Sequence, residues 1–421
     1  MRVAILTTEL IANGGAARQA LMLAQWIEAL GHRATVYATE HCAENCYPEI
    51  ARSIDIRAVE QVSLAEVEKR RRERHHSLTR GAKRHLLASL RLARLVDEPC
   101  DILNPHVRGA TRAAVLCKRS AGAPVVWMCE DARNWEEPGY RPYYSAPVQF
   151  VFDRLMAQLE KPVVRQIDRV VTLDHRVKNI IERYYGRPAE VVRSGVDAVS
   201  FERREAARDE IRVRHGIARN DFLLLWLGIL EPHRRLEDAI EALRLLHLRA
   251  AGPVRLLIAG SGAIAPGYAR KLQDLAARYR LSGSVRFHLA AVPESEMADY
   301  YSAADALVYL AENQCWGLGI FEALACDLPV IVSRSCGAHE VLEHRQTAML
   351  VARRHPEEIA RAVADLVETP GLAEKLAREA RARVLVRITW EAYARNLLRV
   401  FEQVLDGQHE RVVPAHREVF A

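Results

Sequence analysis

Residues 306–331 read ALVYLAENQCWGLGIFEALACDLPVI, and this stretch decides the fold class. The apolar run at 306–309 predicts a buried strand, and a second such run at 329–332 predicts another. Between them, Gly317 opens a turn that leads into a helical segment. A strand, a glycine turn, a helix and a further strand are typical of a parallel sheet covered by helices. The stretch therefore predicts an α/β, Rossmann-like domain.

The same alternation of short β-branched runs and helical segments continues outward through both halves of the chain, so we expect two such domains. A chain of 421 residues also exceeds what one hydrophobic core usually supports. A charged stretch poor in apolar residues separates the halves. The domains expected are 1–197, a linker at 198–220, and 221–388. In doubly wound sheets ligands bind at the carboxyl ends of the strands, which predicts a cleft between the facing loops of the two domains.

Composition places the chain among ordinary globular proteins, with 50% hydrophobic and 27% charged residues. No apolar run is long enough to span a membrane, and the first residues read as a strand rather than a signal peptide. The eight cysteines contain no Cys-x-x-Cys pair. We therefore expect reduced thiols in a cytoplasmic protein.

Two glycine turns and one pair of arginines are suited to binding phosphate. Gly14-Gly15 follows the first strand, and Gly317 precedes a helix, whose N-terminal amide groups favour anions. Arg234-Arg235 lies at a strand-to-helix junction, and guanidinium groups bind diphosphate oxygens in a bidentate manner. An ordinary turn at Gly14-Gly15 and a salt bridge from Arg235 to Glu237 or Asp238 are the alternatives.

The segment GLGIFEALACDLPVI, residues 317–331, resembles the signature of retaining glycosyltransferase family 4. The resemblance extends over most of the chain, through the early Gly-Gly loop, Gly195-Val196-Asp197, Ala304-Asp305, Glu340-Val341-Leu342 and Thr389-Trp390. It implies a GT-B fold of two facing Rossmann-like domains. It also implies that the N-terminal domain binds the acceptor, and that a last helix within 389–421 crosses back to that domain.

The resemblance implies a nucleotide-sugar site mainly in the second domain. Glu322 would bind the ribose and Arg234 the diphosphate, while the turn at Gly317 and Leu318 and the loop at Gly14 and Gly15 would meet the phosphates. We expect Arg234, Glu322 and Gln314 to be the catalytic residues. The full set expected to bind the donor is Gly14, Gly15, Arg234, Arg235, Gly260, Gln314, Trp316, Gly317, Leu318 and Glu322.

Three departures from the family pattern change the sugar-facing end. Gln314 replaces a glutamate, so an uncharged amide would meet the sugar hydroxyls, and Glu312 is the alternative carboxylate. Ile229 replaces an arginine, for which Arg235 could compensate. Glu130 replaces a histidine that lies beside the transferring sugar in the family.

Acceptor contacts are expected from His106, Glu130 and Asp131, which follow two strands of the first domain. A structural histidine and a helix-capping carboxylate are the alternatives. Aromatic residues between 135 and 152 are a further candidate surface for a sugar or an apolar acceptor.

The segment from Lys69 to Arg94 carries ten lysines and arginines against one acidic residue, with leucines at helical spacing. It predicts either peripheral contact with anionic lipid at the inner face of the membrane or a solvated helix face. Nucleic-acid binding is not expected, because no recognition module is present.

Together these features predict a glycosyltransferase that moves a sugar from a UDP- or GDP-linked donor to an acceptor hydroxyl of a glycan, lipid-linked glycan or small molecule. The resemblance implies retention of configuration. We expect no metal and no cofactor, because no Asp-x-Asp signature is present. The alternatives are a pseudo-glycosyltransferase that binds nucleotide sugar as a partner or regulatory subunit, and an epimerase acting on a nucleotide sugar.

Overall fold

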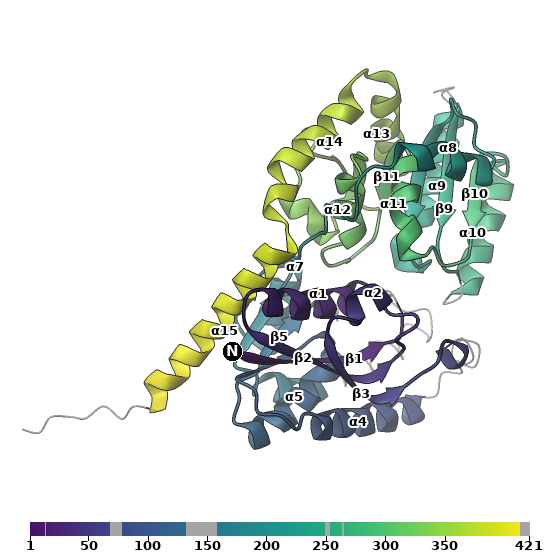
Figure 1. Ribbon diagram of the computed structural model, residues 1–421. Helices are drawn as coiled ribbons and strands as arrows, with labels where there is room; N and C mark the ends of the chain where they lie inside the picture. The colour runs from purple at the N-terminus through teal and green to yellow at the C-terminus, as the bar shows by residue number, and fades with distance from the viewer. Residues whose placement is uncertain (13, 68–77, 132–157, 249–252, 263–264, 413–421) are drawn as a thin grey trace, which may run out of the picture. The chain divides into compact units, whose positions relative to one another are not determined.

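The computed structural model describes residues 1–12, 14–67, 78–131, 158–248, 253–262 and 265–412, which form two compact units (Figure 1). Unit 1 comprises the described residues of Met1–Pro138, Tyr144–Val192 and Trp390–Ala421. Unit 2 comprises those of Arg193–Thr389. Each unit has its own parallel sheet and its own core.

The sheet of unit 1 is parallel throughout the described residues. Four strands follow the order β3-β2-β1-β4, and three follow the order β5-β6-β7. Isolated parallel bridges join Leu103 to Val125 and His106 to Met128, so β5 continues the sheet beyond β4. The strands are β1 (Arg2–Leu10), β2 (Arg33–His41), β3 (Asp55–Gln61), β4 (Ile102–Pro105), β5 (Val126–Cys129), β6 (Arg169–Thr172) and β7 (Ala189–Val191).

Helices cover this sheet because each carries one apolar face. On α1, Leu21, Leu23 and Ile27 are fully buried, and α1 packs on β1, β2 and α15. Gly31, at φ 83°, lets the chain leave the end of α1 and enter β2. The helices of unit 1 are α1 (Gly15–Ala29), α2 (Pro48–Ala51), α4 (Leu78–Leu95), α5 (Val107–Ala121), α7 (His175–Tyr185) and α15 (Trp390–Val412).

Unit 2 contains a six-stranded parallel sheet in the order β10-β9-β8-β11-β12-β13. In both units the order runs outward in two directions from the first strand of the unit, which is the doubly wound arrangement. The Rossmann-like α/β prediction is therefore confirmed. The strands are β8 (Phe222–Leu227), β9 (Val254–Ala259), β10 (Val285–His288), β11 (Ala306–Tyr309), β12 (Val330–Ser333) and β13 (Met349–Val351).

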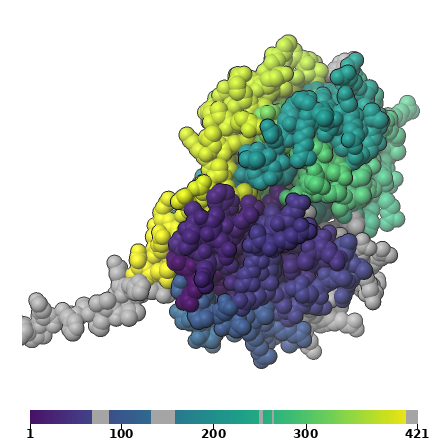
Figure 2. All heavy atoms as spheres, in the orientation of Figure 1, coloured from purple at the N-terminus to yellow at the C-terminus, as the bar shows by residue number. Residues whose placement is uncertain are grey.

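The core of unit 2 lies between this sheet and its helices, with Trp226, Leu243, Ile258 and Leu272 among its buried members. Figure 2 shows all heavy atoms of the chain in the same orientation as Figure 1. The α-helices are α8 (Glu205–Arg214), α9 (Leu236–Leu248), α10 (Pro266–Arg278), α11 (Glu294–Ala303), α12 (Leu318–Ala325), α13 (Pro356–Glu368) and α14 (Leu372–Arg383). Three 3₁₀ turns are η1 (Pro232–Arg234), η2 (Gly337–Val341) and η3 (Leu385–Arg387).

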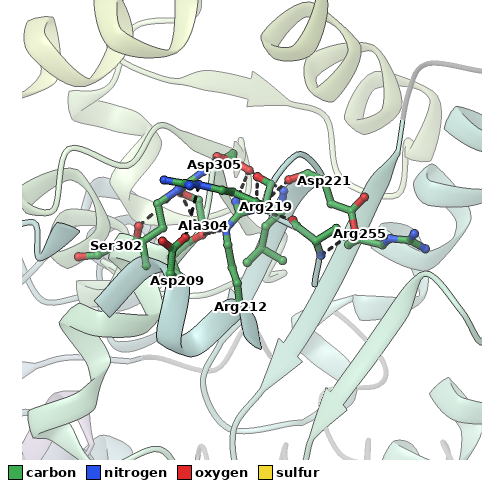
Figure 3. A network of polar contacts seen from close by, with 12 residues as sticks. Asp209, Arg212, Arg219, Asp221, Arg255, Ser302, Ala304 and Asp305 are labelled. Carbon is green, nitrogen blue, oxygen red and sulfur yellow. Dashed lines mark hydrogen bonds and ion pairs between the residues drawn. The ribbon is translucent and has the colours of Figure 1, made fainter. Parts of the chain in front are cut away.

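The stretch expected to be a linker contains α8, which packs on α11 within unit 2. Arg212 of α8 is 1% exposed and donates to the carbonyls of Ala303 and Asp221, both at 2.9 Å, and to Asp305 Oδ2 at 2.7 Å (Figure 3). Asp305 also accepts the Leu223 N–H at 2.7 Å. Because these bonds connect α8 to β8 and β11, the start of unit 2 is a packed element rather than a free connection.

All eight cysteines are free thiols, and seven of them are buried. Burial raises the pKa of the Cys46 thiol to about 12 and that of Cys117 to about 11, which keeps both protonated at neutral pH. Among the residues that the structure describes, no helix is long and apolar enough to cross a membrane.

Candidate functional site

The candidate site of unit 2 lies where the carboxyl ends of β8 and β11 meet. These two strands are neighbours, and the strand order reverses between them. The chain leaves β8 through Gly228 and η1, and it leaves β11 through residues 310–317 before α12 begins. The Glu312 N–H donates to the carbonyl of His233 at 2.8 Å, which ties the two connections together. Such a topological switch point is where doubly wound sheets bind ligands.

Arg234 lies at the centre of this site. Its Nη1 donates to Gln314 Oε1 at 2.7 Å and to the Tyr309 hydroxyl at 3.0 Å. Its guanidinium carbon also lies 6.0 Å from the centre of the Tyr309 ring. Burial raises the pKa of Tyr309 to about 12, partly offset by Arg234, so the phenol is neutral at working pH. The fold therefore brings Arg234 and Gln314, two expected donor residues, into direct contact.

His233 is a second hydrogen-bond partner of Gln314, beside Arg234. Burial, and to a smaller extent the charge of Arg234, lower the pKa of His233 to about 3, against a hydrogen bond to Gln314 that raises it. His233 is consequently neutral at physiological pH. Because Arg234 occupies the amide oxygen of Gln314, the amide NH₂ is oriented away from that guanidinium.

The two residues considered as substitutes in this site are engaged in ion pairs. Glu312 binds Arg354, with Arg354 Nη2 2.9 Å from Glu312 Oε2. Arg235 binds Asp238 through both Nε (3.0 Å) and Nη2 (2.7 Å), which is the salt bridge named as its alternative. If Glu312 were to take the role expected of Gln314, its ion pair with Arg354 would have to break. If Arg235 were to take the role of the arginine that Ile229 replaces, its ion pair with Asp238 would have to break.

The glycine turn before α12 is required by the fold itself. Gly317 has φ +80°, and a Cβ there would meet Cys336 Sγ and Ile320 Cδ1 at 3.1 Å. Leu318 then begins α12 and is half-buried. Trp316 is buried and stacks on Phe321, with ring centres 4.7 Å apart. The structure therefore places Gly317 and Leu318 at the expected turn, and Trp316 in the interior.

Glu322 lies one turn into α12 and is 4% exposed. Its Oε2 accepts a hydrogen bond from the Tyr301 hydroxyl of α11 at 3.0 Å. A carboxylate that is buried needs such donors.

Gly260 and Gly228 have a structural reason for being glycine. A Cβ on Gly260 would lie 1.8 Å from the carbonyl oxygen of Gly228, so the turns after β8 and β9 touch through their backbones. Both residues have positive φ, 137° for Gly260 and 151° for Gly228. The expected donor role of Gly260 is therefore not needed to explain this residue.

Gly14 differs from these glycines. It is the N-cap of α1, with an extended backbone at φ −162°. A Cβ added to Gly14 would meet no atom within 4 Å. Gly15 is the first residue of α1, and the first turn of this helix contains no acidic side chain. Among the residues that the structure describes, no contact therefore demands glycine at position 14.

In unit 1, His106 and Glu130 form a buried, hydrogen-bonded pair. Asn104 Nδ2 donates to the Val126 carbonyl at 2.6 Å, which leaves Asn104 Oδ1 to accept from His106 Nε2 at 3.0 Å. His106 Nδ1 lies 2.6 Å from Glu130 Oε1. With Nε2 acting as donor, one proton must be shared between Nδ1 and Oε1.

The turn after His106 carries backbone strain. Val107 has φ 55°, a conformation that β-branched residues rarely adopt, and its N–H donates to Glu130 Oε2 at 3.0 Å. Asp131 lies on the surface and pairs with Arg176 at 3.7 Å. The fold thus unites His106 with Glu130 and places Asp131 in a separate ion pair. The aromatic residues between 135 and 152 lie outside the described residues.

Three site residues were missed by the sequence reasoning: His233, Tyr301 and Tyr309. Tyr309 ends a strand that the sequence does predict, at the carboxyl edge where ligands bind, and this position was the available signal. Tyr301 contacts Glu322 only because α11 and α12 pack together, which no local pattern indicates.

Two family models match this chain, one in each half. Residues 13–199 match the family model described as Glycosyltransferase Family 4, and residues 207–383 match that described as Glycosyl transferases group 1. A D-inositol 3-phosphate glycosyltransferase of Thermobispora bispora is 31% identical over 337 residues, covering 75% of this chain and 73% of the relative. The chain therefore belongs to the glycosyltransferases that these two family models describe.

Other similarities are more distant. A glycogen synthase of Mycobacterium tuberculosis is 26% identical over 329 residues, covering 77% of this chain and 74% of the relative. Anabaena HepE, solved in complex with UDP and glucose, aligns with a TM-score of 0.73 at 17% identity, over 96% of this chain and 100% of HepE. This likeness shows that the fold is GT-B, as the sequence predicted.

Proposed function

We propose that this glycosyltransferase moves a hexosyl group from a nucleoside diphosphate sugar to an acceptor hydroxyl with retention of configuration, without a metal ion, in the cytoplasm. The observation that carries the proposal is the contact of Arg234 with Gln314 and Tyr309 at the switch point of unit 2. The UDP and glucose bound by HepE support a nucleotide-sugar donor.

In the proposed reaction the bond between the anomeric carbon and the β-phosphate oxygen breaks. The acceptor oxygen bonds to that carbon on the same face, and its proton passes to the leaving phosphate oxygen. Negative charge grows on the diphosphate as the first bond breaks, and Arg234 supplies fixed positive charge there. Glu322 holds the ribose, and the Gln314 amide binds sugar hydroxyls.

A second candidate function is favoured by two pairs of polar side chains that are hydrogen-bonded to each other. Gln314 is occupied by Arg234, and Glu130 is occupied by His106. A protein that binds nucleotide sugar without turning it over would tolerate both arrangements. Such a protein could act as a partner or regulatory subunit, and it would show donor binding without transfer or donor hydrolysis.

The experiment that tests the proposed function is a thermal-shift screen with UDP-, GDP-, ADP- and dTDP-sugars, followed by a transfer and hydrolysis assay. A ligand that binds only the folded state at 100 times its Kd stabilises by about 2.7 kcal/mol, so one nucleotide class should raise the Tm. Donor consumption then separates the transferase from the non-catalytic alternative. A chain that responds to none of the four classes would contradict both.

We also propose that α4 contacts anionic lipid. Three leucines of this helix are exposed, Leu86 by 48%, Leu87 by 53% and Leu90 by 37%, beside the exposed Arg91 and Arg94. The helix lies on the outside of unit 1 (Figure 1). Exposed leucines bordered by arginines suit a bilayer with anionic headgroups.

The lipid proposal predicts co-sedimentation with phosphatidylglycerol vesicles and little with phosphatidylcholine vesicles. The L86S/L87S double variant should bind several-fold less, because two apolar side chains no longer enter the interface. Leu248→Ser is the matched control, since Leu248 is 72% exposed at the end of α9 in unit 2. Equal binding by all three proteins would show that α4 is only a solvated face.

A further inference from the structure

An ion-pair network joins three strand ends at the carboxyl edge of the unit 2 sheet. Glu312 follows β11 and is 9% exposed, and Arg354 follows β13. The Arg354 guanidinium holds both oxygens of the Glu312 carboxylate, with Nε donating to Oε1 at 2.5 Å and Nη2 to Oε2 at 2.9 Å. Strand β12 lies between β11 and β13, so this pair connects strand ends that are not neighbours. Arg235, at the end of η1, lies on the other side, with its Nε 4.0 Å from Glu312 Oε1.

The network is bonded to the turn that carries Arg234. The Glu312 N–H donates to the His233 carbonyl at 2.8 Å, and His233 and Arg234 both belong to η1. A shift of the Glu312 backbone would therefore also move η1. Arg234 in turn donates to Gln314, two residues after Glu312, at 2.7 Å. Arg354 is thus linked to Arg234 through Glu312, by one ion pair and one backbone hydrogen bond.

Three residues in and beside this network have strained backbones. Arg235 (φ 56°), Asn313 (φ 53°) and Arg354 (φ 58°) adopt left-handed conformations, which favour glycine. Strained residues persist where their surroundings hold them, and they cluster at functional sites. At Arg354 the surroundings include the two hydrogen bonds to Glu312. An arginine that occupies a conformation suited to glycine indicates a role for its side chain.

The network also separates two adjacent arginines. Arg235 is bonded to Asp238 at 2.7 Å and lies near Glu312, whereas Arg234 is directed to Gln314. Neighbouring guanidinium groups repel each other, and nearby carboxylates offset that repulsion. Glu312 therefore acts on both arginines, since its carboxylate lies beside Arg235 and its backbone supports the turn that contains Arg234.

We propose that Glu312 and Arg354 are positioning residues for Arg234. Their ion pair fixes the backbone of Glu312 and with it η1, so that the Arg234 guanidinium is preorganised to meet the diphosphate. A charge that is already in place needs no rearrangement when the glycosidic bond breaks. This inference rests on the proposed function, and it adds two residues that act without touching a substrate. Glu312 then supports the site rather than taking the place of Gln314 at the sugar.

The first test is Arg354→Gly. Glycine suits the left-handed backbone at this position, which offsets the loss of the ion pair, so the Tm should stay close to that of the wild type. The kcat should nevertheless fall about 3- to 30-fold, because a small misplacement of a catalytic group lowers the rate. Affinity for UDP should also fall, whereas affinity for uridine should not change, since uridine lacks the diphosphate. If another nucleotide class raises the Tm in the screen, its nucleoside diphosphate and nucleoside replace this pair of probes.

Arg345→Gly is the matched control. Arg345 also has a left-handed backbone, at φ 60°, and it also forms an exposed ion pair in unit 2, with Asp365 of α13. The substitution therefore removes the same kind of residue, conformation and pair. The kcat and the affinity for UDP should both equal those of the wild type.

The second test asks whether the effect passes through Arg234. Arg354→Gly should lower kcat and UDP affinity in the wild type but produce no further loss in an Arg234→Ala background, because the side chain to be positioned is then absent. Glu312→Gln should behave like Arg354→Gly, since it removes the charge from the other partner. Arg354→Lys keeps a positive charge and should recover part of the loss.

The outcomes separate this inference from the proposed function. Equal losses from Arg354→Gly in the wild type and in the Arg234→Ala background would overturn the positioning role, as would a lower Tm with unchanged kcat and UDP affinity. A wild-type chain that binds UDP without transferring sugar would contradict the proposed transferase, while the comparison of UDP with uridine would still decide the role of Arg354. A chain that binds no nucleotide would overturn both.

Discussion

Replacing Arg234 with alanine is expected to lower kcat about 10²- to 10³-fold while leaving the affinity for the free nucleoside unchanged. The proposed reaction builds negative charge on the leaving diphosphate, and Arg234 is the cation at the centre of the site. The substitution also removes the hydrogen bonds from Arg234 to Gln314 and Tyr309. Steady-state kinetics at saturating donor and a nucleoside thermal shift measure the two quantities.

Arg234→Lys is the informative control for this prediction. Lysine keeps the charge but loses the planar fork, so it should recover a large part of kcat if charge is what matters. Gln314→Ala tests the neighbouring amide, and it should raise the donor KM more than it lowers kcat. Equal loss of nucleoside affinity and turnover in Arg234→Ala would argue against a diphosphate role.

The Glu322→Ala variant should bind nucleotide more weakly by about 1–3 kcal/mol, or roughly 5- to 150-fold in Kd. The expected cause is the loss of hydrogen bonds from the two ribose hydroxyls to the carboxylate. Isothermal calorimetry with the nucleoside diphosphate measures the change. Nucleotide affinity equal to that of the wild type would refute the ribose assignment.

Tyr301 supplies the control for Glu322. Its hydroxyl donates to Glu322 Oε2, so Glu322→Ala also leaves a buried phenol without this acceptor. Tyr301→Phe removes the same hydrogen bond while keeping the carboxylate. If nucleotide affinity falls in Glu322→Ala and holds in Tyr301→Phe, the carboxylate acts on the ligand rather than through the packing of α11 on α12.

Sequence reasoning found the fold because buried parallel strands leave continuous apolar runs. Residues 222–227 and 306–309 are such runs, and both are strands. The apolar pattern does not indicate the edge strand β3, because Asp55, Arg57 and Glu60 interrupt its apolar residues. A strand at the edge of a sheet is less buried than a central one. Helix α8 was hidden for a different reason. Its buried residues are Ile211 and Arg212, and a pattern of apolar residues counts every arginine as surface.

The site could be predicted only where the strand order of the sheet brings two segments together. Arg234 and Gln314 come together because β8 and β11 are neighbours, which a doubly wound sheet implies. The pair of His106 and Glu130 depends on the register of β4 against β5, which no single segment encodes. Likewise, the sequence alone does not distinguish Gly260, where a Cβ would clash with the Gly228 carbonyl, from Gly14, where a Cβ would meet no described residue within 4 Å.

Unit 1 is interrupted by unit 2 in the order of synthesis. Helix α15 (Trp390–Val412) packs on α1, and its Tyr393, Leu397 and Phe401 are buried. During translation the residues of Arg193–Thr389 emerge complete while α1 still lacks this partner. Unit 2 can therefore finish folding first. Unit 1 stays without its last helix until then, so the part of α1 that packs on α15 has no such cover during that time. This reverses the usual N-terminal-first order of domain folding.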